Sequence, residues 1–228
     1  MMQINMRNAM SSGILISAVV LVSLFPGAAD ARRSRKKRSS PPGFSYYLLA
    51  LSWAPDFCAI PANPQDPAEC GIGKKVGFVV HGLWPQGQNS RGPENCGPAG
   101  AVAPEIVTVM LQYIPTLSLI QHEWKTHGTC SGLSAADYFA AVRKARDSVI
   151  IPDQFKAPAQ TVKLSPAAIE AAFAAANPSF PKTAFRTSCT NNALQEARLC
   201  FDKNLSAQAC TASAGECGLK TITVRPVQ

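Results

Sequence analysis

Charged side chains and long apolar runs are both scarce in this sequence of 228 residues. Charged residues make up 16% and hydrophobic residues 46%, a balance that excludes wholesale disorder and favours a packed domain. Apart from one stretch near the amino terminus, no apolar run approaches the ~20 residues that a membrane-spanning helix needs. Acidic residues are also few, 14 against 22 Lys and Arg, so the formal charge of +8 indicates an anionic partner such as nucleic acid or a lipid surface.

The apolar stretch near the amino terminus predicts a secretory signal peptide at residues 1–31. Arg7 precedes the apolar residues 13–25, and the small-residue site Ala29-Asp30-Ala31 follows them. This layout is typical of a signal peptide cleaved after Ala31, whereas a membrane anchor needs a longer run. We therefore expect a mature protein with no transmembrane segment, secreted or periplasmic, in a compartment where disulfides persist.

Most of the positive charge lies in a short segment directly after that site. Residues 32–38 carry six basic side chains, which repel one another and predict a solvated tail. Together with Pro41-Pro42-Gly43 this tail forms a linker at residues 32–43. Seven of the 22 basic residues and one of the 14 acids lie at or before Arg38, leaving 15 and 13, a net charge of +2. The globular domain, expected at residues 44–228, is nearly neutral.

Local patterns indicate an α+β fold for that domain. Short apolar runs bounded by Pro and Gly predict buried strands, and serine caps followed by helical spacing predict two helices. The strands are expected at residues 46–53, 75–81, 193–202 and 221–224. One helix is expected after Ser134, and Ser165-Pro166 opens the other, at 167–177. Because strands and helices do not alternate regularly, we expect a central, mostly antiparallel sheet flanked by several helices, not a parallel array. Eight cysteines, an even number, add disulfides to this single domain.

The three histidines lie in two short segments rich in Trp, Gly and Cys. His81 follows a predicted strand, whereas His122 and His127 bracket the sequence His122-Glu123-Trp124-Lys125-Thr126-His127. On a helix Glu123 and His127 are i,i+4 neighbours, so the carboxylate would orient the imidazole and favour its protonated form. The plain alternative is a helix end with an incidental His–Glu pair.

A zinc site built from the three histidines and a free Cys130 is a second alternative. His122 and His127 are five residues apart, which puts them about 140° apart around an ideal helix. The i,i+4 spacing of the familiar zinc helix is therefore missing, and metal is disfavoured.

The two histidine segments resemble the active-site segments of the T2 family of secreted ribonucleases. These are residues 78–85, FVVHGLWP, and residues 122–130, HEWKTHGTC. Residues 47–58 resemble the opening strand of that family, and residues 196–203 are similar to its carboxy-terminal strand. The resemblance extends from about residue 44 to the end of the chain, with both motifs in order.

The resemblance implies an endoribonuclease that cleaves single-stranded RNA to 2′,3′-cyclic phosphate ends, with low base specificity and without a metal or other cofactor. By the family pattern His127 is the general base, His81 is the general acid, and His122 binds the phosphate. Glu123 would sit beside the reacting phosphate and tune His127. Histidine suits both proton transfers, because its ordinary pKa lies near neutral pH.

Two neighbours of His81 are candidate base-binding residues. An indole such as Trp84 can stack a base for about 1–3 kcal/mol, and core packing is the equally simple alternative that the family likeness disfavours. Gln86 could contact a base edge. Trp53 and Trp124 are interpreted as core residues.

One position departs from the family pattern. Thr126 stands where the family has a lysine directly before its histidine, and Lys125 comes one residue too early. On an ideal helix Lys125 points about 100° away from position 126, so we do not transfer the lysine's role to it. Thr126 offers at most a neutral hydrogen bond, which predicts reduced turnover.

The cysteine pairing also follows from the resemblance, since eight cysteines allow 105 connectivities. It implies a Cys96–Cys130 bond and a Cys200–Cys210 bond nested inside Cys189–Cys217, which leaves Cys58 and Cys70 as the last pair. A Cys130 bridged in this way could not bind zinc.

Two functions of other classes remain as alternatives. The chain could be a non-catalytic RNA-binding or signalling relative, which would explain the missing lysine. It could instead be a cationic surface-active protein that acts through residues 32–38. The main hypothesis is a monomeric enzyme whose partner is single-stranded RNA.

Overall fold

The computed structural model of the protein describes residues 43–63 and 65–228. The predicted signal peptide at residues 1–31, the basic tail at 32–38 and nearly all of the linker at 32–43 lie outside these residues. In the described ranges, no helix has the length and apolar character needed to cross a membrane.

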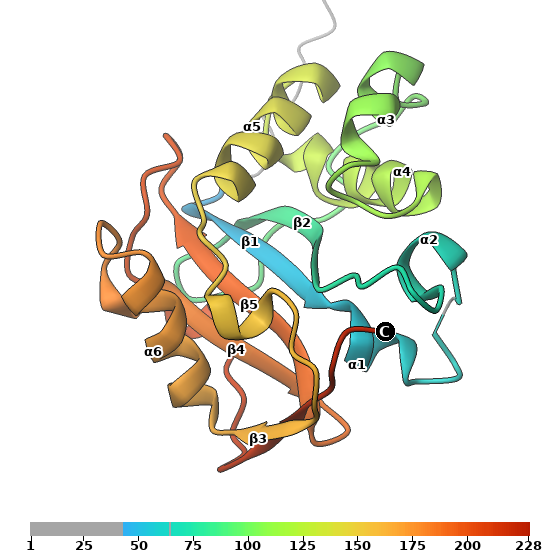
Figure 1. Cartoon of the computed structure of the whole chain (residues 1–228). Coiled ribbons are helices and arrows are strands. Elements are labelled where there is room, and N and C mark those ends of the chain that lie inside the picture. The colour runs from blue at the N-terminus through green and yellow to red at the C-terminus, as the bar shows by residue number, and fades with distance from the viewer. Residues whose placement is uncertain (1–42, 64) are drawn as a thin grey trace, which may run out of the picture. The chain divides into compact units, whose positions relative to one another are not determined.

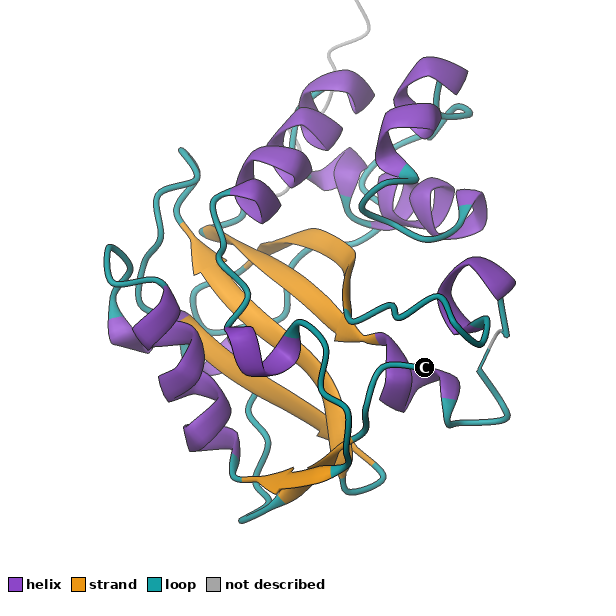
Figure 2. Cartoon of the chain, in the orientation of Figure 1, coloured by secondary structure: helices purple, strands orange, loops and turns teal. Residues whose placement is uncertain are grey.

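A twisted sheet of six strands forms the centre of the described domain (Figure 2). The edge strand β2 (Phe78–Gln86) pairs with β1 (Tyr46–Trp53), and β1 pairs with β5 (Ala193–Phe201). β4 (Phe185–Thr190) also pairs with β5, and the short strands β6 (Ile222–Val224) and β3 (Val162–Leu164) complete the sheet. Every pair is antiparallel except β5 with β6, so the expected α+β fold with a mostly antiparallel sheet is confirmed.

The helices surround this sheet (Figure 1). Their bounds are α1 (Ala54–Cys58), α2 (Pro67–Cys70), α3 (Pro104–Met110), α4 (Leu117–Thr126), α5 (Ala135–Asp147) and α6 (Pro166–Ala176). Short 3-10 turns occur at Gly128–Cys130, Asp153–Phe155, Lys182–Ala184 and Ala212–Ala214. Helices α3, α4 and α5 lie together beyond β2, while α6 packs beside β4. As predicted, the hydroxyl groups of Ser134 and Ser165 cap the first turns of α5 and α6.

The second predicted strand is longer than expected at one end and shorter at the other. It begins at Phe78 rather than Lys75 and continues through His81 to Gln86. Pro85 would end an interior strand because it has no N–H to donate, but β2 is an edge strand, where proline is tolerated. The extension places His81 and Trp84 on one rigid strand.

Both faces of β1, the strand between β2 and β5, are covered. Leu49, Leu51 and Trp53 belong to the main core, whereas Tyr46 and Leu48 pack in a smaller cluster on the other face. Trp53 also packs as a core residue beneath the rings of Phe78 and Phe155, as predicted.

All eight cysteines are paired. The bonds are Cys58–Cys70, Cys96–Cys130, Cys189–Cys217 and Cys200–Cys210, which confirms the expected connectivity. Because Cys130 is bonded to Cys96, it cannot serve as a ligand in the alternative zinc site. Nor does the described part of the chain hold a cluster of three His, Cys, Asp or Glu side chains arranged to bind a metal.

Candidate active site

The two histidine segments meet where β2 passes the end of α4. His81 and Trp84 project from β2, His122 and Glu123 belong to α4, and His127 directly follows that helix. The Trp84 ring lies 5.1 Å from the His81 ring and 5.3 Å from the His127 ring, centroid to centroid. The His122 ring is 6.5 Å from that of His127. The structure therefore brings together five side chains from two segments, and His81 and His127 are 46 positions apart in the sequence.

Glu123 is the buried centre of this group. Its residue is 1% exposed, and its Oε2 accepts a hydrogen bond of 2.9 Å from Nε1 of Trp84. Oε1 lies 3.9 Å from Nε2 of His81 and has no hydrogen-bond partner among the described residues. Burial raises the pKa of Glu123 to about 7, although the His81 charge and the Trp84 hydrogen bond oppose it. An unpartnered buried oxygen is costly in a stable protein and suggests a site completed by a ligand.

A glycine allows this approach of helix to strand. Gly82 lies between His81 and Leu83 on β2, and a Cβ at that position would collide with the Glu123 carboxylate. The close approach of Glu123 in the second motif to β2 therefore requires a glycine at position 82 in the first motif.

The expected pairing of Glu123 with His127 does not occur. The Glu123 carboxylate faces Trp84 and His81, and no ion pair joins it to His127 in the described structure. Helix α4 ends at Thr126, and His127 has φ −114°, so the imidazole leaves the ideal i,i+4 position. Burial, with the charges of His122 and His81, lowers the pKa of His127 to about 4. The sequence argument for a protonated His127 was thus wrong.

His81 has the opposite environment. Its Nδ1 lies 2.7 Å from Oε1 of Glu196 on β5. Burial lowers the pKa of His81, but the hydrogen bond and charge of Glu196 and the charge of Glu123 outweigh it, and the pKa is raised. Glu196 is a site residue that sequence reasoning missed. The available signal was an acidic residue in the middle of the strand predicted at residues 193–202.

Glu196 is itself held by a neighbour on the same strand. Its Oε2 accepts a hydrogen bond of 2.8 Å from Nε of Arg198, whose Nη1 donates to the carbonyl of Ala214 at 2.9 Å. The Arg198 guanidinium also lies over the Trp84 ring, 5.8 Å from its centroid. Burial raises the pKa of Glu196, but the bonds and charges of His81 and Arg198 outweigh this and lower it.

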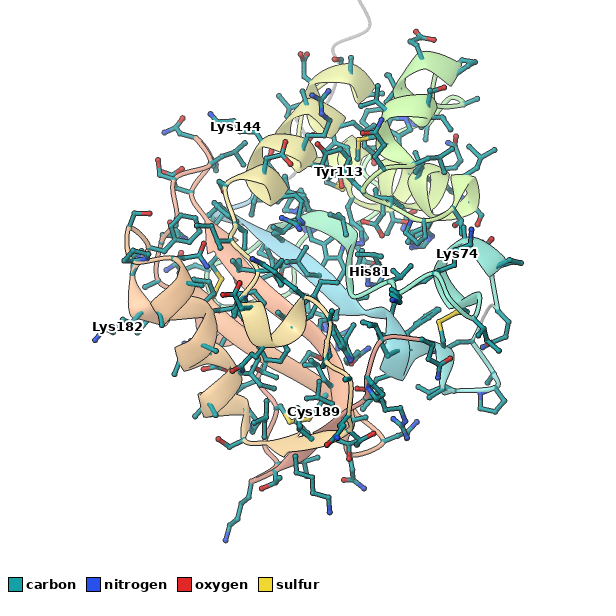
Figure 3. The ribbon with its side chains drawn as sticks, viewed as in Figure 1. Lys74, His81, Tyr113, Lys144, Lys182 and Cys189 are labelled. Atoms are coloured by element: carbon teal, nitrogen blue, oxygen red, sulfur yellow. A yellow bond between two sulfur atoms is a disulfide. The ribbon has the colours of Figure 1, made fainter. Side chains whose placement is uncertain are left out.

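Two pockets open on either side of these residues. The first, of about 690 Å³, is lined by His81, His122 and Glu196 together with Glu69 of α2 and Leu119 of α4. Figure 3 shows His81 projecting from β2 on the side where α2 and α4 lie. The second, of about 240 Å³, has a different set of lining residues, among them Trp84, Gln86, Arg91, His127 and Arg198. His81 and His127 thus line different pockets.

Of the other residues discussed from the sequence, Gln86 lines a pocket, whereas Thr126 does not. Gln86 lines the second pocket, but its Oε1 also accepts a hydrogen bond from the backbone of Gly92, so part of its polar group is engaged. Lys125 is exposed, whereas Thr126 is 9% exposed and lines neither pocket. Trp124 is half-buried against Tyr138, consistent with its interpretation as a packing residue.

Comparison with known proteins identifies similar sequences among ribonucleases. A sequence model described as the Ribonuclease T2 family matches residues 44–210. A ribonuclease of Aeromonas hydrophila is 36% identical over 125 residues, which cover 55% of this chain and 53% of that protein. A probable ribonuclease of Haemophilus influenzae is 32% identical over 177 residues, covering 72% of this chain and 60% of that protein. The matched part of the chain therefore spans a little over half the length of these relatives.

Solved structures share the fold. An RNase-related protein from Calystegia sepium superposes with a TM-score of 0.64 at 21% identity, over 81% of this chain and 98% of that chain. At such low identity the likeness supports a common fold and no more.

Proposed function

This chain belongs to the ribonuclease T2 family, and on that premise we propose that it is an endoribonuclease that cleaves single-stranded RNA to 2′,3′-cyclic phosphate ends. The reaction requires a base to take the proton of a 2′-hydroxyl group and an acid to protonate the departing 5′-oxygen. In the proposal His127 is the base and His81 is the acid, as the family pattern implies.

The observation that carries the proposal is the opposite perturbation of these two histidines on either side of Trp84. The pKa of His127 is lowered to about 4, so its imidazole is neutral and able to accept a proton at neutral pH. The pKa of His81 is raised, so its imidazolium is available to donate one. Titratable groups whose pKa values are moved apart are the pattern expected of an acid–base pair.

Each proton and bond then has an assigned place. His127 takes the 2′-hydroxyl proton, the 2′-oxygen bonds to phosphorus, and the bond from phosphorus to the 5′-oxygen breaks. Nε2 of His81 gives its proton to that 5′-oxygen. The exposed His122 binds the phosphate, and the unpartnered Oε1 of Glu123 lies 3.9 Å from Nε2 of His81. With a pKa of about 7, the Glu123 carboxyl can be protonated near neutrality and can donate to a phosphoryl oxygen.

The same assignment orients the substrate. The nucleotide that bears the attacking 2′-hydroxyl group lies at the second pocket, beside His127 and Trp84. The departing nucleotide lies at the first pocket, beside His81. In the second pocket stacking on Trp84 supplies binding energy that does not depend on base identity, and Gln86 contacts a base edge, so base specificity is low.

We propose that the protein acts as a monomer outside the cytoplasm, secreted or periplasmic after cleavage near Ala31. Its four disulfides support this location, because such bonds form and persist in oxidising compartments. No metal or cofactor enters the proposed reaction.

The test is incubation of the mature protein with single-stranded RNA in excess chelator, followed by analysis of the product ends. We expect cyclic phosphate ends, and a loss of roughly 10²–10⁴-fold in rate for His81→Ala and for His127→Ala. Lys125→Ala, a change at an exposed residue beside the site, is the matched control and should keep the parent rate. Folded protein that binds RNA without cutting it would instead identify a non-catalytic relative. Activity that is lost only on deletion of residues 32–38 would identify the tail as the active part.

A further inference from the structure

We propose that Glu196 is a positioning residue for the reaction, which holds the His81 imidazole in the tautomer and orientation that present Nε2 to the departing oxygen. The inference rests on the proposed function, in which His81 is the general acid. It assigns a role to a residue outside both histidine motifs, on the strand β5.

The hydrogen bond to Glu196 fixes which ring nitrogen can react. Nδ1 of His81 lies 2.7 Å from Oε1 of Glu196 and must carry a hydrogen to donate to that carboxylate. The proton that is transferred therefore resides on Nε2. Nε2 is the nitrogen on the side of Glu123, 3.9 Å from its unpartnered Oε1. When Nε2 has lost its proton, the bond to Glu196 still holds the ring in the same orientation.

Glu196 can act as a fixed support because the fold immobilises it. It is 1% exposed and lies within β5 between two paired strands, opposite Ser52 of β1 and Ser188 of β4. Arg198 holds its second oxygen at 2.8 Å and is itself anchored by the Ala214 carbonyl. A support held by packing and by its own hydrogen bonds is what precise positioning of a reactive group requires.

A glycine, Gly215, leaves room for the Arg198 guanidinium. Gly215 has φ +76°, and a Cβ there would come within 2.5 Å of Nη1 of Arg198. A residue with a side chain at this position would be strained by the positive φ and would displace the end of the guanidinium.

The charges around His81 determine the pH dependence that this role predicts. Glu196 and Glu123 favour the protonated imidazole, whereas Arg198 of β5 opposes it. His81 also acts electrostatically on Glu69 of α2 and on His127. Glu196 makes the largest favourable contribution, so its loss should lower the pH at which His81 gives up its proton.

Glu196→Gln tests the role with two substrates. The first is RNA, whose 5′-alkoxide leaving group needs a proton, and the second is a nucleoside 3′-nitrophenyl phosphate, whose nitrophenolate leaves without one. We expect kcat on RNA to fall about 10–100-fold with little change in KM, and kcat on the nitrophenyl ester to stay within about threefold. The basic limb of the RNA pH profile should move to lower pH. Glu170→Gln is the matched control, because Glu170 is a partly buried glutamate of α6 that binds the Thr187 backbone away from the site.

Two kinetic outcomes would overturn the inference. Equal losses on both substrates would mean that Glu196 only supports the fold, and unchanged rates on both would mean that His81 needs no such support.

A measurement without substrate separates this inference from the proposed function. Nitrogen NMR of the parent protein should find the hydrogen of neutral His81 on Nδ1 and a raised His81 pKa, and Glu196→Gln should lower that pKa. Identical His81 spectra and titrations in the two proteins would refute the positioning role. A parent protein with the expected spectra but no nuclease activity would instead refute the proposed function.

Discussion

Trp84 donates a hydrogen bond of 2.9 Å from its indole nitrogen to Oε2 of Glu123 and so joins the edge strand β2 to helix α4. One oxygen of the buried carboxylate is thereby satisfied, while the other is left without a partner beside His81. The indole thus has two roles that a sequence cannot separate. Its ring lines the second pocket, where the Arg198 guanidinium lies over it, and its nitrogen binds the Glu123 carboxylate.

Trp84→Phe should therefore cost more stability at pH 8 than at pH 5. Glu123 has a folded-state pKa of about 7, above its ordinary value, so ionising this group costs folding stability as the pH rises from about 4.5 to 7. Removing the indole donor leaves the ionised carboxylate less well bonded, at a cost of about 1–3 kcal/mol. Near pH 5 the carboxyl is neutral in the folded state and this part of the loss is smaller.

Urea unfolding of Trp84→Phe at the two pH values measures the difference. Trp124→Phe is the control, since Trp124 packs against Tyr138 and does not contact the carboxylate through its indole nitrogen in any described hydrogen bond. A loss of stability for Trp84→Phe that is the same at pH 5 and pH 8 would contradict the assigned role of the hydrogen bond.

The pH dependence of kcat/KM should have its acidic limb near pH 4 and its basic limb above pH 6.5. The acidic limb reports protonation of the base His127, whose pKa is lowered to about 4, and the basic limb reports loss of the proton from His81, whose pKa is raised. The measurement is kcat/KM as a function of pH, from steady-state rates at substrate concentrations well below KM. Glu123→Gln removes the carboxyl that titrates at about 7 and should leave the limb near pH 4 in place. An acidic limb above pH 6.5 in both proteins would contradict the assignment of His127.

Thr126→Lys should raise kcat roughly fivefold. Thr126 stands where the family has a lysine, and a charge-assisted hydrogen bond to the phosphate contributes about 1 kcal/mol more than a neutral one. Because Thr126 is 9% exposed, the lysine must extend its stem along the buried surface to bring its ammonium group into the site. Single-turnover rates compare the variant with its parent.

Lys125→Ala provides the control for that comparison, because the exposed Lys125 belongs to neither pocket and should not change the rate. An unchanged rate for Thr126→Lys in a stably folded protein would show that the missing lysine does not limit turnover.

Removal of the Cys96–Cys130 disulfide should affect activity more than removal of Cys200–Cys210. The first bond ties the loop after the His81 segment to the end of the His127 segment, across 34 residues, whereas the second closes 10 residues. Each double Cys→Ala variant should lose about 2–4 kcal/mol of stability, with the larger loss for the longer loop. Thermal unfolding gives the stability, and RNA cleavage well below both midpoints gives the activity. Equal activities at that temperature would mean that the first bond does not hold the two segments in register.

Features encoded locally were accessible from the sequence. Strand β1 has the predicted bounds, and α5 and α6 begin at their predicted serine caps, because apolar spacing and capping act over a few neighbouring residues. The strands β3 and β4 were not predicted. β3 spans only three residues, and most residues of β4 are only partly buried, so neither gives a clear apolar pattern.

By itself, the sequence determined the family, the cysteine pairing implied by it, and the candidate side chains of the site. Only the tertiary structure decided how those side chains relate to one another. His81 meets Glu196 across 115 residues of sequence, and Glu123 turns to Trp84 instead of to its helical neighbour His127. Burial lowers the pKa of His127, whereas at His81 the hydrogen bond and charge of Glu196 and the charge of Glu123 outweigh burial and raise the pKa. Spacing along one helix describes neighbours on that helix, but a pKa depends on the solvent and charges that every packed element removes or supplies.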